Sequence, residues 1–590
     1  MKITPNIFVF LLSLLASQLV FAGSATWKLN PPSDVWLSPG NWTPATVPNG
    51  PSDTATFGTS NQTSVVITTQ INQKVELSGI QFNPGASAFT ITLSGGFTVM
   101  DITGIGIVNN SGVMQNLTTD NCGYPQFHQN ATIGDLVTIT NPESNGCSWT
   151  YFLDTSSAGA ATIINVGSPT WDDIAGSTNF FGSSTAGNAT ILNDGTAAVG
   201  PGGWTGFYET SSAGTATINN MGVTSGSGGG TFFDQGSTAD HATFINSDGG
   251  GVAFERHSRA GYATFTNNPV SPGATGCTII FSTSCSADHS TLINNGGDGA
   301  GAAGGYIYFW GESHADDATI VAHGGVNGGN GAMVVFDNNS TGDQARIDVL
   351  GNGQLDISKH AVPGIEIGSL EGDGSVLLGA NHLTIGANNL STTFKGVISG
   401  TGSVSKVGRG QLVLENANTY TRGTTLERGS LVLQNSTGSA TGSGAVTVNG
   451  GALSGLGSVA GTVTIGSGVG KGASLAPGGK GNGALHIGGS LTLNADATCQ
   501  WLLNSNRQSA TQASANGITL NAAQFASADL GNGALAPGTV FTVINNTAAT
   551  PIAGTFVNLS DGSAVTVGNN TFQANYEGGD GNDLTLTVVP

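Results

Sequence analysis

Three aspartates with histidines beside or near them are the side chains of this sequence whose types and spacing could do chemistry. They recur at one position of a repeat whose other members are glycine: Asp240, Asp288 and Asp316, with His241, His289 and His314. Carboxylates and imidazoles aligned along one edge of a fold could coordinate a divalent cation.

We interpret these aspartates as turn residues instead. Aspartate and asparagine tolerate the left-handed backbone conformation best after glycine, which occupies the rest of this column. In a stacked coil, Gly261 separates Asp240 from Asp288, so these two lie about 9.6 Å apart, too far to share one ion. Only Asp288 and Asp316 are neighbours. We therefore predict no metal ligands and no cofactor here.

The sequence holds no other signature of catalysis. It contains neither a Gly-x-Ser-x-Gly elbow nor a His-Glu-x-x-His zinc motif. Asp172 and Asp173 are adjacent, so on a strand they would point to opposite faces and could not act as a pair. The acidic segment 578–583 resembles one turn of a calcium-binding repeat, but such sites need tandem copies, and we expect a hairpin turn. We predict no catalytic residues.

The five cysteines allow one specific pairing. Cys122 and Cys147 are 25 residues apart, the interval between Gly134 and Gly159, so they are expected at equivalent positions of neighbouring coils. Stacked positions about 4.8 Å apart suit a disulfide. A bridge between Cys277 and Cys285 requires the chain to fold back, and Cys499 would remain free. The alternative is that all five are small apolar fillers.

These groups must be positioned by a repeat with three columns of residues. The first, which we call the turn column, is Gly134, Gly159, Gly187, Gly214, Asp240, Gly261, Asp288 and Asp316. Seven residues earlier stand Phe127, Phe152, Phe180, Phe207, Phe233, Phe254, Phe281 and Phe309. Six residues later, from the second unit on, stand Asn165, Asn193, Asn220, Asn246, Asn267 and Asn294. A degenerate further copy is assigned to Phe336 and Gly342.

The contents of one unit predict an all-β fold. Segment 180–195 consists of short β-branched or apolar runs broken by small turn formers, without a helical period. A repeat of 20 to 50 residues indicates a solenoid, a propeller or an array, and the Trp-Asp signature of propeller blades is absent. We predict a parallel β-helix with a phenylalanine stack inside and an asparagine stack at a turn, hydrogen-bonded along the axis. The alternative is an array of β-sandwiches.

Composition limits the class of partner. The chain has 590 residues, 93 of them glycine, and only 9% are charged. Its net charge of −21 and the lack of a Lys/Arg cluster make nucleic acid and anionic lipid poor partners. A hydrophobic fraction of 38% with 25 phenylalanines argues against disorder.

The N-terminus predicts export. Lys2 precedes an apolar core at 7–16, and Val20-Phe21-Ala22 supplies a cleavage site, as in a secretory signal peptide. We expect no membrane span in the mature chain. Three tryptophans follow, Trp27, Trp36 and Trp42, which could cap the solenoid or form a carbohydrate-stacking platform. Capping is favoured because no convergent polar groups accompany them.

Segments 406–414, 418–426 and 429–433 place an Asn-Thr-Tyr turn and a Gly-Thr-Thr run between alternating strands. Together they resemble the autotransporter-associated β-strand repeat of bacterial surface proteins. The resemblance implies a right-handed β-helix, a location outside the cell or on its outer surface, and often adhesion. It carries over no catalytic residues. We recognise no translocating barrel or sorting tail in the chain, so the sequence does not identify the partner that would anchor the protein.

The expected protein is therefore a secreted, elongated β-helical surface protein with a structural or adhesive role, whose partners would be surface glycans or other cells. A polysaccharide-active enzyme or carbohydrate-binding module on the same scaffold is the alternative. We expect a signal peptide at 1–22, an N-terminal cap with the first coils at 23–120, the Phe/Gly/Asn repeat at 121–350, the autotransporter-like region at 351–490 and a β-rich C-terminal segment at 491–590.

Overall fold

The structure is a computed structural model that describes residues 23–590 except 70–72, 144–146, 171–173, 198 and 471. The predicted signal peptide at 1–22 therefore lies outside the described residues, as do Asp172 and Asp173. The described part is built from β-strands, with one short 3-10 helix, η1 (Pro39–Asn41). Within it, no helix has the length and apolar character needed to cross a bilayer.

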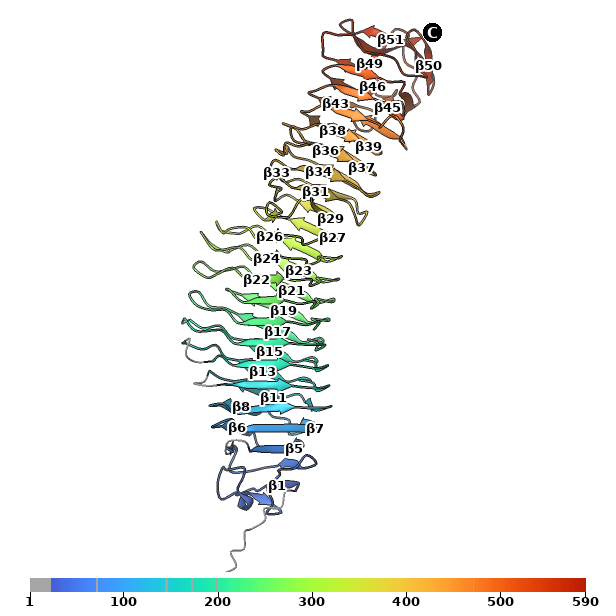
Figure 1. Ribbon diagram of the computed structural model, residues 1–590. Helices are drawn as coiled ribbons and strands as arrows, with labels where there is room; N and C mark the ends of the chain where they lie inside the picture. The colour runs from blue at the N-terminus through green and yellow to red at the C-terminus, as the bar shows by residue number, and fades with distance from the viewer. Residues whose placement is uncertain (1–22, 70–72, 144–146, 171–173, 198, 471) are drawn as a thin grey trace, which may run out of the picture.

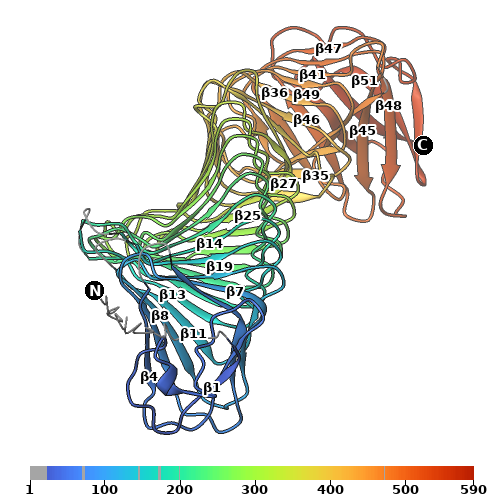
Figure 2. The same cartoon turned by 60° about the horizontal axis from the view of Figure 1, so that its bottom comes forward.

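The chain winds into a parallel β-solenoid of about 19 coils. Successive coils stack into an elongated body that changes direction near β27 (Gly342–Val349) and β29 (Gly364–Gly372) (Figure 1). Figure 2 shows the same change as an offset between the blue-to-green part and the orange part. Within the repeat, each strand pairs in parallel with the strand one coil later, so the predicted parallel β-helix is confirmed and the sandwich array is wrong.

Two sheets carry the repeat. The strands of the first sheet are β9 (Tyr124–Phe127), β12 (Trp149–Phe152), β14 (Ser177–Phe180), β16 (Trp204–Phe207), β18 (Gly230–Phe233), β20 (Gly251–Phe254), β22 (Thr278–Phe281), β24 (Tyr306–Phe309) and β26 (Met333–Phe336). Those of the second are β11 (Val137–Asn141), β13 (Thr162–Asn165), β15 (Thr190–Asn193), β17 (Thr217–Met221), β19 (Thr243–Ser247), β21 (Thr264–Asn267), β23 (Thr291–Asn294), β25 (Thr319–Ala322) and β27 (Gly342–Val349).

Local sequence explains these short strands. Most alternate one buried residue with one partly exposed residue, which is the period-two pattern of a strand with one face on a core. Phe152 lies opposite Phe180, and Asn165 lies opposite Asn193. Like residues therefore stack on like residues, and the register of each coil follows from the one before.

The N-terminal end is closed by the three tryptophans. Trp27, Trp36 and Trp42 are at most 2% exposed and pack around Phe57, which ends β3 (Thr54–Phe57). Trp42 lies 5.0 Å from Trp27 and 4.9 Å from Trp36 between ring centroids. Because these rings are buried, they cap the first coil and offer no platform for a sugar.

The second half of the chain continues the parallel solenoid. The segments that resemble the autotransporter-associated repeat form β34 (Ser403–Lys406), β35 (Gln411–Leu414), β36 (Thr424–Leu426) and β37 (Ser430–Leu433), all in parallel pairs.

At the C-terminal end the pairing becomes antiparallel. β49 (Val540–Asn546) and β51 (Asn570–Gly578) both pair with β52 (Asp583–Val589). Segment 578–583 is the turn of the β51–β52 hairpin.

Candidate functional site

The phenylalanine column lies inside the coil and forms a continuous stack. Ring centroids are 4.7 to 4.9 Å apart from Phe127 to Phe336, and neighbouring rings are within 11° of parallel. All nine side chains are fully buried. Burying one such ring stabilises the fold by about 1.5–3 kcal/mol, so this column is core and not a ligand site.

The asparagine column is equally buried. Each amide donates to the Oδ1 atom of the asparagine one coil later, at 2.8 to 2.9 Å from Asn165 through Asn294. The side chains lie at the last position shared by these strands, not at a turn, and Asn141 adds a member before the predicted series. Threonines of the first sheet, such as Thr205 donating to Asn193, supply a second hydrogen bond. The column therefore ties the two sheets together.

The turn column has the backbone conformation that its residue types require. From Gly159 to Asp316 every member has a positive φ, between 47° and 63°. Gly134 does not have a positive φ. It directly follows β10 (Thr132–Ile133), which pairs with β7 (Val99–Asn109), so in this coil a strand stands where the later coils have a turn. In most coils the N–H of this residue is capped by a serine or threonine two positions earlier, as Ser212 Oγ caps Gly214 at 2.9 Å.

One assignment in the turn column was wrong. The residue seven positions after Phe336 is Asp343, which has a φ of 45°, whereas Gly342 has no positive φ. Three consecutive coils therefore carry acids, at Asp288, Asp316 and Asp343. The sequence argument against a shared ion was that only Asp288 and Asp316 lie on adjacent coils. That argument does not hold once Asp343 is included.

Two of these carboxylates replace a missing hydroxyl cap. Arg259 occupies the serine position before Gly261, and Asp288 of the next coil accepts from the Gly261 N–H at 3.0 Å. His314 occupies the same position before Asp316, and Asp343 of the next coil accepts from the Asp316 N–H at 3.4 Å. The acids thus cap a backbone N–H of the preceding coil.

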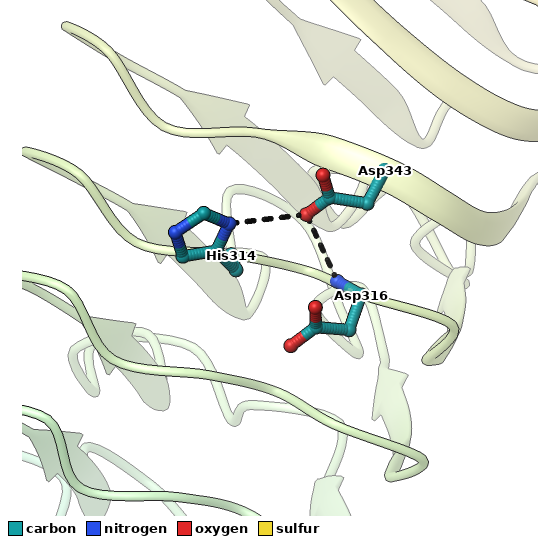
Figure 3. Close-up of side chains that lie close together, drawn as sticks. All are labelled: His314, Asp316 and Asp343. Atoms are coloured by element: carbon teal, nitrogen blue, oxygen red, sulfur yellow. Dashed lines mark hydrogen bonds and ion pairs between the residues drawn. The ribbon is translucent and has the colours of Figure 1, made fainter.

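These side chains line an open groove of about 640 Å³. One ligand atom each from His314, Asp316 and Asp343 lies within 4.8 Å of the others (Figure 3). An imidazole with two carboxylates has the donor chemistry of a divalent-cation site. In the structure the same atoms are bonded within the protein: Ser286 donates to Asp316, and Thr341 donates to Asp343. The acids that line the groove are thus accounted for by hydrogen bonds within the protein, including the caps on turn N–H groups.

An exposed row of rings lies beside the groove. Tyr262 is stacked between His241 and His289, with centroids 5.1 and 4.6 Å away. His241 pairs with Asp240 at 2.5 Å, and His289 pairs with Asp317 at 2.6 Å. His241 and His289, which were singled out in the sequence, therefore contact neighbouring aspartates.

The outer face of the first sheet carries a second surface that the sequence analysis missed. We call it the aromatic strip; its side chains are partly exposed, and they are Tyr124, Trp149, Tyr151, Phe181, Trp204, Tyr208 and Phe232. Apart from Trp204, neighbouring rings from Tyr124 to Phe232 have centroids 4.7 to 6.3 Å apart, with the tightest stack between Phe181 and Tyr208. Tyr124, Trp149 and Trp204 stand three residues before the buried phenylalanine of their strand, and this common offset is the signal that the sequence offered. The other four stand one residue before or after that phenylalanine, so only the coiling joins all seven into one strip.

The polar atoms of the aromatic strip have no hydrogen-bond partner among the described residues. The hydroxyls of Tyr124, Tyr151 and Tyr208 and the indole N–H groups of Trp149 and Trp204 make no hydrogen bond to any residue that the structure describes. Burial raises the pKa of Tyr151 to about 12 and shifts the pKa of Tyr124 and Tyr208 upward. These hydroxyls therefore stay protonated and can donate at physiological pH.

The structure brings one cysteine pair together. Cys122 and Cys147 have Sγ atoms 2.15 Å apart and Cα atoms 4.4 Å apart. Cys277, Cys285 and Cys499 are buried free thiols. The disulfide between Cys277 and Cys285, which the sequence left undecided, is therefore not formed.

Comparison with known proteins links part of the chain to an adhesin. No family model matches the sequence. A stretch of 92 residues, 15% of this chain, is 40% identical to the adhesin BmaC autotransporter of Brucella suis, and it spans 3% of that protein. The crystal structure of the Haemophilus influenzae Hap adhesin aligns with 91% of this chain and 64% of its own, at 10% identity and a TM-score of 0.25. The chain thus spans less than two thirds of either protein.

Proposed function

We propose that the protein is an adhesin-like, passenger-type β-solenoid that acts outside a bacterial cell or on its surface and binds through its lateral wall. The observation that carries this proposal is the aromatic strip, an unpaired row of rings on the outside of an otherwise polar coil. Contiguous exposed apolar patches of this kind mark interaction sites. The similarity of 92 residues to an autotransporter adhesin supports the same role.

The charges of the groove support a role without catalysis. Asp288 is engaged by Arg259 and by the Gly261 N–H, and Asp343 by Thr341 and by the Asp316 N–H. A glycosidase needs one carboxyl that is free to protonate the leaving group and another that attacks or activates water. Carboxylates that hold the backbone of the coil are poorly suited to either task.

Adherence of the purified full-length chain tests the proposal. Beads coated with the protein should adhere to epithelial cells or bacterial cells more than beads coated with albumin do. Background adherence in every assay would overturn the adhesive role.

The rival function is cleavage of a polysaccharide in the groove, which its volume and its His/Asp lining favour. A reducing-end and unsaturated-product assay on a polysaccharide panel addresses this rival. Turnover that is lost in an Asp316→Asn variant would establish it and would refute the non-enzymatic function.

A further inference from the structure

We propose that the aromatic strip binds a neutral glycan chain laid along the solenoid axis. The inference rests on the proposed adhesive function and names the class of ligand for it. Three properties of the strip carry it: fixed rings, free hydrogen-bond donors, and a rim that repels anions.

The rings are held in place by the strand beneath them. Gly206 lies under the middle of the aromatic strip, and a Cβ atom there would come within 2.6 Å of the Tyr208 ring and 2.9 Å of the Trp204 ring. Both rings therefore lie over the glycine. The rings of Phe181 and Tyr208 are 10° from parallel and 4.7 Å apart. A fixed aromatic surface loses little side-chain entropy when it binds a partner.

The aromatic strip combines apolar surface with hydrogen-bond donors that no described residue accepts from. Three phenol hydroxyls and two indole N–H groups are free among the described residues. A sugar presents C–H groups on its ring faces and hydroxyls at its edges, so it needs apolar surface and hydrogen-bonding groups side by side. Aromatic side chains with a polar tip provide both.

Two acidic side chains next to the aromatic strip, Asp154 and Glu209, form what we call its rim, and they favour an uncharged partner over an anionic one. Asp154 and Glu209 stand at equivalent positions two residues after the phenylalanines of their coils. Each uses one carboxylate oxygen to accept a backbone N–H, from Gln129 at 3.0 Å and from Gly182 at 2.6 Å. The same oxygen of Asp154 lies 3.6 Å from His128 Nδ1, so each acid has a second oxygen left to accept from a ligand hydroxyl. With a net charge of −21 over the whole chain, this rim disfavours an anionic glycan, a nucleic acid or an anionic membrane.

The length of the aromatic strip indicates a chain and not a single sugar. The rings extend over five successive coils, from β9 to β18, at steps of 4.7 to 6.3 Å. Strands of neighbouring coils are about 4.8 Å apart, so the strip is long enough for several sugar units in a row.

Binding of the full-length protein to an array of neutral and anionic oligosaccharides tests the inference. We expect binding to one or more neutral chains, with little dependence on salt. Trp204→Ala and Tyr208→Ala should each weaken this binding at least tenfold. Trp310→Ala is the matched control, because Trp310 is an exposed aromatic residue at the position equivalent to Tyr208 but lies beyond the strip on β24's coil. Its binding should equal that of the wild type.

Unchanged far-ultraviolet circular dichroism and unfolding midpoints establish that the variants are folded, and Tyr208→Phe, which keeps the ring, provides a second folded variant with a milder loss. The inference is overturned by the absence of any neutral ligand, by a preference for anionic glycans or phosphatidylglycerol vesicles, or by equal binding of the strip variants. Bead adherence that persists when array binding is absent would leave the adhesive function standing and remove only its assignment to a glycan.

Discussion

The Asp288 carboxylate accepts a hydrogen bond of 3.0 Å from the Gly261 N–H, which belongs to the preceding coil. At that coil Arg259 replaces the serine or threonine that caps this N–H elsewhere, and Arg259 also pairs with Asp288. A substitution in one coil is thus compensated in the next. Asp288 has this structural role, and Asp343 plays the same role for the Asp316 N–H.

Asp288→Gly should destabilise the fold, and Asp240→Gly should not. Both changes relieve the positive φ, but only the first removes a cap from a backbone N–H, which costs about 1–3 kcal/mol. Asp240 accepts from Ser212 and His241 side chains and caps no backbone N–H in the described chain. Urea unfolding together with hydrogen exchange at Gly261 measures the difference. Equal midpoints for the two variants would contradict the capping role.

Asn193→Ala should be strongly destabilising. The change leaves the Asn165 amide without its acceptor on the next coil and removes the acceptor of Thr205. Each buried polar group left unpaired costs about 1–3 kcal/mol. Asn188→Ala is the control, since Asn188 is an exposed residue in the turn between β14 and β15, the strand that ends at Asn193. Urea midpoints that fall equally in both variants would show that the column does not support the coil.

Cys122 and Cys147 should be recovered as one disulfide-linked peptide pair after digestion without reduction. Their equivalent positions on neighbouring coils bring the two Sγ atoms together. Cys277, Cys285 and Cys499 should react with iodoacetamide only after unfolding, because all three are buried and burial raises their thiol pKa values. Mass spectrometry that finds Cys122 and Cys147 separately alkylated would remove the bridge.

The contribution of Lys406 to stability should rise with pH between about 8 and 10.5. Its side chain is 1% exposed, and burial lowers its pKa from 10.5 to about 8. Over this interval Lys406 holds fewer protons in the folded chain than in the unfolded chain, so through this residue raising the pH favours folding. This contribution is complete above 10.5 and is lost as the pH falls through 8.

Lys406→Met tests the assignment. It should raise the unfolding midpoint at pH 7, where the buried ammonium is costly, and change it less at pH 10. The ammonium donates to the carbonyls of Val407 and Gly408, which limits the gain. A midpoint that falls equally at both pH values would show that the lysine stabilises the coil as a cation.

A chelator should leave thermal stability unchanged. The carboxylates of Asp316 and Asp343 accept hydrogen bonds from Ser286 and Thr341, so the groove does not need an ion to hold them. Differential scanning calorimetry with and without EDTA measures the effect. A midpoint lowered by several degrees and restored by a divalent cation would mean that His314, Asp316 and Asp343 form a metal site.

Much of the coil could be predicted from sequence because its core columns repeat one residue type. Phe152, Phe180 and Phe207 stand at one offset from a glycine, and in a solenoid equal offsets become vertical stacks. The left-handed turn was predictable for the same reason, since Gly159, Gly187 and Gly214 mark it. The copy at Phe336 was misassigned because a glycine, Gly342, lies next to the true position, Asp343.

A second left-handed column escaped prediction altogether. The residue two positions after each phenylalanine has a positive φ in nine successive coils: Gln129, Asp154, Gly182, Glu209, Gln235, Arg256, Thr283, Gly311 and Asn338. Glycine occurs only twice among them, so no residue type reveals the conformation. The pairing of each coil with its neighbours imposes it against the intrinsic preference of most of these side chains.

The sequence by itself determined the all-β solenoid, its buried stacks and its cysteine pair, because each depends on residues at constant intervals. Tertiary structure decided where surfaces form. Tyr151 and Phe181 stand at different offsets from their core phenylalanines and meet only when the chain coils, and Asp288 reaches Gly261 only because the two lie on adjacent coils. Core positions repeat because every coil must fit the one below it, whereas surface positions vary freely, and function on a solenoid is built from the positions that vary.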